Sequence, residues 1–329
     1  MRTRDPVTPP ARWPIHPALL DGEALSSWLH RTAAAYELTL PGLLEHDLGH
    51  HRITDAGLDS DPPPDLLESL SGRSGVEPDR LRRMSLAGLV PWLLDSLDPC
   101  SCSFETYTRQ FSVLLPTDRR PSRTPPPGWR PWLPPGRPVQ RACRRCLDDA
   151  VVPALLLTWN LPLQLSCPTH RCLLEPCECL PAVYVGWESD QDRPTPASDP
   201  VAAMDARTSQ ALRDGRVTLP RRQVHAGVWF RLLRTLLDEL CAPLGRAGCR
   251  GTDLRQVWEQ LGGRNMRLHR RPFEELTWPD QALLLEAAAT AIGLIERGTI
   301  LARGTHGSLL TPEPVSTSHR DLRRAPPRP

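Results

Sequence analysis

The sequence predicts a mainly helical protein with a small β zinc-ribbon module near its centre. Three observations support this. Apolar residues recur at helical spacing towards both ends of the chain. Six of the ten cysteines lie between residues 143 and 179. Proline-rich stretches separate these parts. We therefore expect an N-terminal helix-turn-helix, a central zinc ribbon and a C-terminal helical bundle.

The 329 residues divide into five predicted parts. Their 38 prolines cluster, and such density disfavours helices. The parts are a helical N-terminal region with the helix-turn-helix at 11–100, a Pro/Arg-rich linker at 101–142, the zinc-ribbon module at 143–185, a C-terminal helical domain at 200–310, and a disordered tail at 311–329.

Charge and hydropathy exclude several classes of protein. The formal net charge is only +2, and every basic residue is arginine, so any contact with nucleic acid must be local rather than a general coating. No apolar segment resembles a signal peptide, and the most apolar helix, 282–295, is too short to span a bilayer. We expect a cytoplasmic, reducing location without membrane contact. Closely spaced cysteines there are metal ligands more often than disulfides.

The N-terminal region begins with two predicted helices within residues 21–49. Leu25, Trp28 and Leu29 mark one apolar face of the first, which Asp21 could cap. Thr39 could cap the second, whose first turn tolerates a proline.

A second helical pair, 65–71 and 77–84, is joined by a turn at Gly75 and has the outline of a helix-turn-helix. Its second helix carries Arg80, Arg82 and Arg83, which we assign to DNA binding. A plain helical hairpin with a solvated basic face is the alternative reading. Towards the C-terminus, four amphipathic helices are predicted at 201–214, 227–240, 253–261 and 279–297.

The cysteine-rich segment contains two knuckles of equal reach. Cys143 and Cys146 form one, and Cys167 and His170 form the other, about twenty residues later in the chain. This is the spacing of a zinc ribbon, and three cysteines with one histidine form a closed, structural ligand set for Zn²⁺. Arginines 144 and 145 lie inside the first knuckle and could offset its negative charge.

The remaining cysteines of this segment allow a second zinc site but do not require one. Cys172, Cys177 and Cys179 could belong to one, alone or with a distant ligand such as His225, Cys241 or Cys249, or they could be idle. Enzymatic motifs are absent from the sequence: it has no deaminase signature, no Walker A loop and no His-Glu-x-x-His. We therefore expect a protein without catalytic residues.

Two stretches resemble one known family, TniQ. "DGEALSSWLHRTAAAYELTLPGLLEHDLG" has the family's Gly-Glu-x-Leu-x-Ser-Trp-x-x-Arg opening at residues 22–31. "CRRCLDDAVVPALLLTWNLPLQLSCPTHRCLLEPCEC" has its Cys-x-x-Cys-Leu, a tryptophan, Cys-x-x-His, a leucine and a further cysteine pair, in that order. The last pair, Cys177-x-Cys179, is shorter than the family's usual Cys-x-x-Cys.

The resemblance implies a non-enzymatic component of a transposition system, similar to the TnsD target selectors. Such a protein binds target DNA or a targeting complex and recruits an AAA+ ATPase that regulates the transposase. Implied partners are thus DNA, that ATPase, a transposase or guide complex, and a second copy of the chain as a homodimer. The alternatives are a zinc-containing helix-turn-helix transcriptional regulator and a metal-dependent hydrolase or nuclease.

Overall fold

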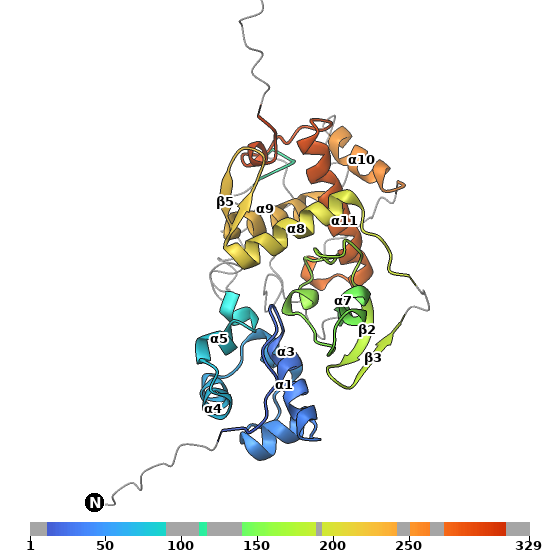
Figure 1. Ribbon diagram of the computed structural model, residues 1–329. Coiled ribbons are helices and arrows are strands. Elements are labelled where there is room, and N and C mark those ends of the chain that lie inside the picture. The colour runs from blue at the N-terminus through green and yellow to red at the C-terminus, as the bar shows by residue number, and fades with distance from the viewer. Residues whose placement is uncertain are drawn as a thin grey trace, which may run out of the picture.

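The computed structural model describes residues 12–89, 112–116, 140–188, 193–241, 251–263 and 273–313. In Figure 1 the N-terminal helices lie at one end of the molecule, the helices α8 to α11 lie at the other, and the cysteine-rich segment lies to one side between them. Most of the predicted linker and all of the predicted tail beyond residue 313 fall outside the described residues. Helices dominate the part that is described, alongside a small antiparallel sheet.

The N-terminal region is a set of short helices around its own apolar core. Leu25, Trp28 and Leu29 are fully buried there, as their spacing predicted. The elements are α1 (Leu25–Ala35), α2 (Leu40–Gly42), the π-helix η1 (Leu43–Asp47), α3 (Asp55–Ser60), α4 (Pro64–Ser74), α5 (Pro78–Arg82) and the 3-10 helix η2 (Leu86–Leu89).

Two predicted helix caps have different outcomes. The Thr39 hydroxyl accepts a hydrogen bond from the Gly42 amide at 3.2 Å, which confirms it as the cap of α2. Asp21 does not cap α1, because the helix begins later, after Ala24. Instead the chain turns at Gly22, whose φ of 72° is a left-handed conformation that glycine adopts without strain.

The predicted helical pair around Gly75 is present as α4 and α5. Gly75 has a φ of 74° and ends α4, as expected of a left-handed C-terminal residue. Helix α5 is shorter than predicted, since it ends at Arg82 after five residues. Leu81 and Met84 are buried beneath it, so the arginines of this segment face outwards.

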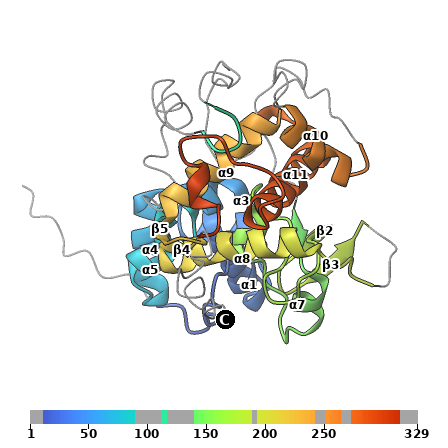
Figure 2. The same cartoon turned by 90° about the horizontal axis from the view of Figure 1, so that it is seen from above.

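The central segment folds as a three-stranded antiparallel sheet with order β1-β2-β3. Ala142 pairs with Glu175, and Cys179 pairs with Val185. Figure 2 shows β2 and β3 at the periphery of the molecule. The elements are β1 (Arg141–Ala142), α7 (Arg144–Asp148), the 3-10 helix η4 (Leu157–Asn160), β2 (Glu175–Leu180) and β3 (Tyr184–Trp187).

The C-terminal region contains the four predicted helices, each with ends within two residues of its predicted bounds. They enclose the largest apolar core, with Trp229 and Phe230 fully buried. The elements are α8 (Asp199–Asp214), β4 (Arg216–Thr218), β5 (Gln223–His225), α9 (Ala226–Leu240), α10 (Gly251–Gln260), the 3-10 helix η7 (Phe273–Glu275), α11 (Trp278–Glu296) and the 3-10 helix η8 (Gly307–Leu309). Among the described helices, none combines the length and the apolar character that crossing a bilayer would demand.

Residues 112–116 lie within the predicted Pro/Arg-rich linker at 101–142 and are packed against the C-terminal helices. Val113, Leu114 and Leu115 are buried in the C-terminal core. Their three backbone amides donate to the buried carboxylate of Glu239, at 3.0, 2.6 and 3.3 Å respectively. The segment also accepts backbone hydrogen bonds from residues 303, 304 and 306. It therefore belongs to the C-terminal helical region, although it precedes the cysteine-rich segment in the chain.

Candidate metal centre and arginine-lined cleft

The first cysteine knuckle is built where strand β1 passes into helix α7. Cys143 directly follows β1 and is the N-terminal cap of α7, with its Sγ 3.5 Å from the amide of Cys146. That amide points at the sulfur because one helical turn separates the two residues. Both thiols therefore face the same point beside the helix.

The second knuckle is a turn between two paired segments. Ser166 pairs with Leu173, and the Cys167 amide donates to the carbonyl of Cys172 at 2.8 Å. Between them Arg171 has a φ of 51°, which reverses the chain just after His170. This turn brings His170 back towards Cys167 and places both against the first knuckle.

The four predicted ligands meet at one point. All four ligand atoms lie within 4.8 Å of one another. The Nδ1 of His170 is 3.4, 3.2 and 3.7 Å from the Sγ atoms of Cys143, Cys146 and Cys167, and the last two sulfurs are 3.6 Å apart. A tetrahedral Zn²⁺ with bonds of about 2.3 Å to sulfur and about 2.0 Å to nitrogen would separate its ligands by about 3.5–3.8 Å. The set is therefore compatible with zinc.

Because the three thiols lie close together, their pKa values differ from one another. Hydrogen bonds to Cys146 and Cys167 raise the pKa of Cys143, while hydrogen bonds from Cys143 and Cys146 lower the pKa of Cys167. Cys167 is thus the thiol that most readily becomes a thiolate. A metal ion that binds all three must displace the remaining protons, so binding would release protons and weaken at low pH.

Two arginines and an aspartate lie around the set. Arg144 bonds to Glu175 at 2.9 Å and lies 4.6 Å over the ring of Trp187. Arg145 is exposed. On the other side of the ligands, Asp149 has a carboxylate oxygen 3.5 Å from Nε2 of His170. A carboxylate in that place orients an imidazole that binds metal through Nδ1.

The remaining cysteines do not gather into a second set within the described residues. There, the four ligands above are the one group with metal-binding geometry. The Sγ of Cys172 lies 3.5 Å from that of Cys143, whereas Cys177 and Cys179 are buried along β2. His225 instead caps α9, and Cys249 lies outside the described residues.

Arg141 is a residue that the sequence analysis missed. Its guanidinium is buried behind β1 and donates to the carbonyls of Trp159, Leu161 and Gln164 at 2.7–2.9 Å. It also lies 3.8 Å over the ring of Trp278 on α11. The sequence could have indicated this role, because Arg141 lies two residues before the first ligand and a charged side chain so close to a buried knuckle needs partners.

The central segment is docked on the N-terminal helices through the residues just before and within α1. Glu23 pairs with Leu156, and the Ala24 amide donates to the Leu155 carbonyl at 3.0 Å. The Leu155 amide donates in turn to the Ser27 hydroxyl at 2.9 Å. Ser27 itself donates to the buried carboxylate of Glu23, which Arg31 also binds at 2.7 Å. One hydrogen-bonded network therefore joins the two parts.

A match to one protein family covers this docked unit. A family model described as TniQ matches residues 14–174, from the start of the N-terminal helices to the second knuckle. The chain belongs to the TniQ family. TniQ proteins are associated with transposition. No curated protein and no solved structure gives a significant match to this chain.

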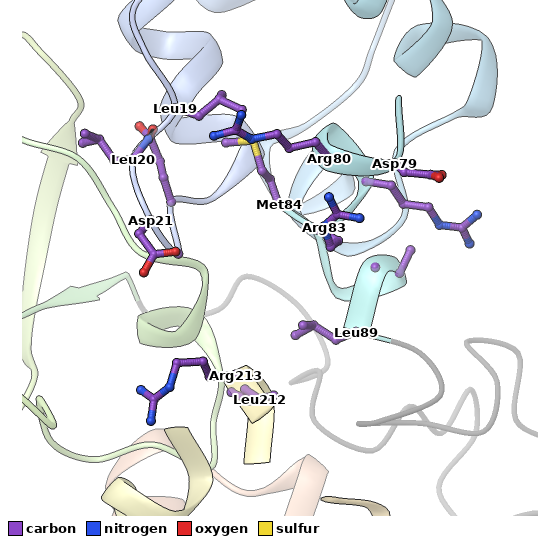
Figure 3. Close-up of a pocket in the computed structure, with 15 residues that line it drawn as sticks. Leu19, Leu20, Asp21, Asp79, Arg80, Arg83, Met84, Leu89, Leu212 and Arg213 are labelled. Carbon is purple, nitrogen blue, oxygen red and sulfur yellow. Dashed lines mark hydrogen bonds between the residues drawn. The ribbon is translucent and has the colours of Figure 1, made fainter. Parts of the chain in front are cut away.

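This TniQ protein also has a cleft of about 1040 Å³ between its N-terminal helices and α8. Arg80, Arg82 and Arg83 line it, and their guanidinium groups have no hydrogen-bond or ion-pair partner among the described residues. Figure 3 shows Arg80 and Arg83 on one side of the cleft, with Asp21 and Arg213 on the other. The three arginines of the predicted DNA-binding helix are thus gathered at one accessible surface.

Proposed function

We propose that this protein is a non-enzymatic target-site selector in transposition, which binds DNA or a targeting complex and recruits an AAA+ ATPase that regulates the transposase. The observation that carries the proposal is the extent of the TniQ match. It covers the N-terminal helices, the Cys/His set and the hydrogen-bonded network between them, and so covers one structural unit.

A structural role of the metal supports an adaptor rather than an enzyme. Three sulfurs and one nitrogen complete a tetrahedron, so a bound Zn²⁺ would keep no open position for water or substrate. The residues Cys143, Cys146, Cys167 and His170 would hold the ion and fix the two knuckles relative to each other.

The arginine-lined cleft supports DNA as one partner. Arg80, Arg82 and Arg83 are exposed and unpaired within the described structure, and a guanidinium binds phosphate oxygens in a fork. Contacts of this kind position a protein on the duplex without reading its sequence. A guide complex with an RNA backbone would present the same phosphates.

An exposed apolar patch on the central segment supports a protein partner. Val151, Val152, Leu180, Val183 and Tyr184 form it, with Val151 99 % exposed. The two parts of the patch adjoin, because the Ala182 amide donates to the Pro153 carbonyl at 3.3 Å. The exposed acids 148 and 149 flank the patch and would repel DNA. We assign this patch to the ATPase.

The experiment that tests the proposal measures both partners with two variants. Arg82→Ala with Arg83→Ala should weaken DNA binding and lower the slope of log affinity against log salt by about 2, since each lost phosphate contact removes about 0.9. Val151→Asp with Val183→Asp should abolish capture of the ATPase in a pull-down from a host that expresses the neighbouring genes.

Each variant is the control for the other. The arginine variant should still capture the ATPase, and the valine variant should still bind DNA. Recovery of DNA binding without any ATPase would favour a transcriptional regulator. Turnover of DNA restored by Mg²⁺ or Mn²⁺ would favour a metal-dependent nuclease.

A further inference from the structure

The thiol of Cys172 lies directly beside one residue of the metal-binding set, Cys143. Its Sγ lies 3.5 Å from that of Cys143, which is within the range of the distances between the four ligands themselves. The residue is only 3 % exposed and is not in a disulfide. A buried thiol that contacts one ligand could bind the ion after a single ligand is displaced.

The backbone holds Cys172 in this place from two sides. Its carbonyl accepts from the Cys167 amide at 2.8 Å, and the residue pairs with Pro196 on the other side. Both neighbours fix the backbone of Cys172, and its thiol lies against that of Cys143.

His170 is the ligand that can be displaced at the least cost. It lies at the tip of the turn, its side chain is 21 % exposed, and the residue after it has a left-handed backbone. Thiolates are the softer donors and bind Zn²⁺ strongly. A set of four thiolates would carry one more negative charge than the set with histidine, however, and Glu175 already occupies Arg144. The histidine set is therefore the resting one.

We propose that Cys172 is a reserve ligand, which completes the coordination of the ion as a fourth thiolate when His170 is displaced. The inference rests on the metal site of the proposed function and adds a second coordination state to it. With two sets available, the turn at 168–171 can move against a partner while the ion stays bound.

Substitution with Co²⁺ tests the two sets in the full chain, because sulfur-to-cobalt absorbance grows with each thiolate bound. His170→Ala should keep stoichiometric Co²⁺ and show stronger sulfur-to-cobalt absorbance than the unmodified chain. His170→Ala with Cys172→Ala should bind Co²⁺ at least about tenfold more weakly than His170→Ala alone. Equal loss in the single and double variants, or an unchanged thiolate count in His170→Ala, would overturn the proposal.

A second measurement avoids the histidine variant. Release of Zn²⁺ to a chelator should be several-fold faster in Cys172→Ala, because the reserve ligand no longer recaptures the ion. Cys177→Ala is the matched control, since that thiol is equally buried in the same apolar cluster and has no contact with the four ligands. Equal rates of Zn²⁺ release in the two variants would overturn the reserve-ligand proposal and leave the metal site standing. A metal-free, natively folded wild-type chain would overturn the metal site as well.

Discussion

At the scale of single residues, Arg141 decides how the metal-binding segment meets the C-terminal helices. Its guanidinium is buried, donates hydrogen bonds to three carbonyls and lies over one indole ring. Burial lowers its pKa to about 9, and the nearby carboxyl of Asp205 opposes that change. At neutral pH the guanidinium is still charged, so each contact is a charge-assisted one.

Replacement of Arg141 by methionine should cost about 3 kcal/mol of unfolding free energy, because the buried carbonyls of Trp159 and Gln164 would lose the guanidinium donor. Urea unfolding monitored by tryptophan fluorescence measures this. Arg145→Met is the control, since Arg145 is exposed on the neighbouring helix. Equal stabilities of the two variants would show that Arg141 does not fix this interface.

Asp59 predicts a pH dependence of stability. It is buried beneath the start of α1 and accepts from the amide and the hydroxyl of Ser26 at 2.9 and 2.8 Å. Burial raises its pKa from 3.8 to about 7. The folded state thus binds this proton more tightly than the unfolded chain, so the stabilisation is complete below pH 3.8 and is lost as the pH rises to about 7.

Asp59→Asn should flatten this decline, by on the order of 2–4 kcal/mol between pH 4 and pH 7. The measurement is thermal or urea unfolding across that range. Part of the decline should persist, because burial also raises the pKa of Asp205 to about 7. Asp61→Asn, at the exposed residue that ends α3, should leave the slope unchanged.

At the scale of elements, local patterns predicted what local contacts determine. The four C-terminal helices follow from apolar spacing, and the cap at Thr39 follows from side-chain chemistry three residues away. The four ligands followed from two short spacings. The buried strip 112–115 could not be predicted, because its partners are Glu239, more than 120 residues away, and the segment 303–306. The β4–β5 hairpin was missed because each strand has only three residues.

Glu239→Gln tests how the strip is held. An amide would turn an N–H towards at least one of the three backbone amides, so the unfolding free energy should fall by about 2 kcal/mol. Glu259→Gln, at an exposed position on α10, should have no effect. Thermal unfolding of both variants measures the difference, and an unchanged midpoint for Glu239→Gln would show that the carboxylate is dispensable.

At the scale of the whole molecule, the metal-binding segment joins two parts that have cores of their own. It contacts the N-terminal helices through residues 155–157, and the C-terminal helices through Arg141 and through Asp205, which accepts from Ser166. Its own apolar cluster is the smallest of the three, and five of its ten buried residues are cysteines. We therefore expect a bound ion to contribute much of the order of this segment, since structural zinc supplies about 10–16 kcal/mol in small domains.

Removal of the metal with a chelator should therefore destabilise the metal-binding segment and leave the C-terminal helices folded. Amides of residues 140–188 should exchange with solvent much faster in the metal-free chain, while those of α8, α9 and α11 keep their protection, because the largest core does not contain the ligands. Hydrogen exchange read by mass spectrometry resolves these segments. Because the loosened segment also holds the N-terminal helices through residues 155–157, DNA binding through the arginine-lined cleft, which includes residues of both ends, should weaken too. Uniform protection with and without metal would mean that packing alone orders the centre.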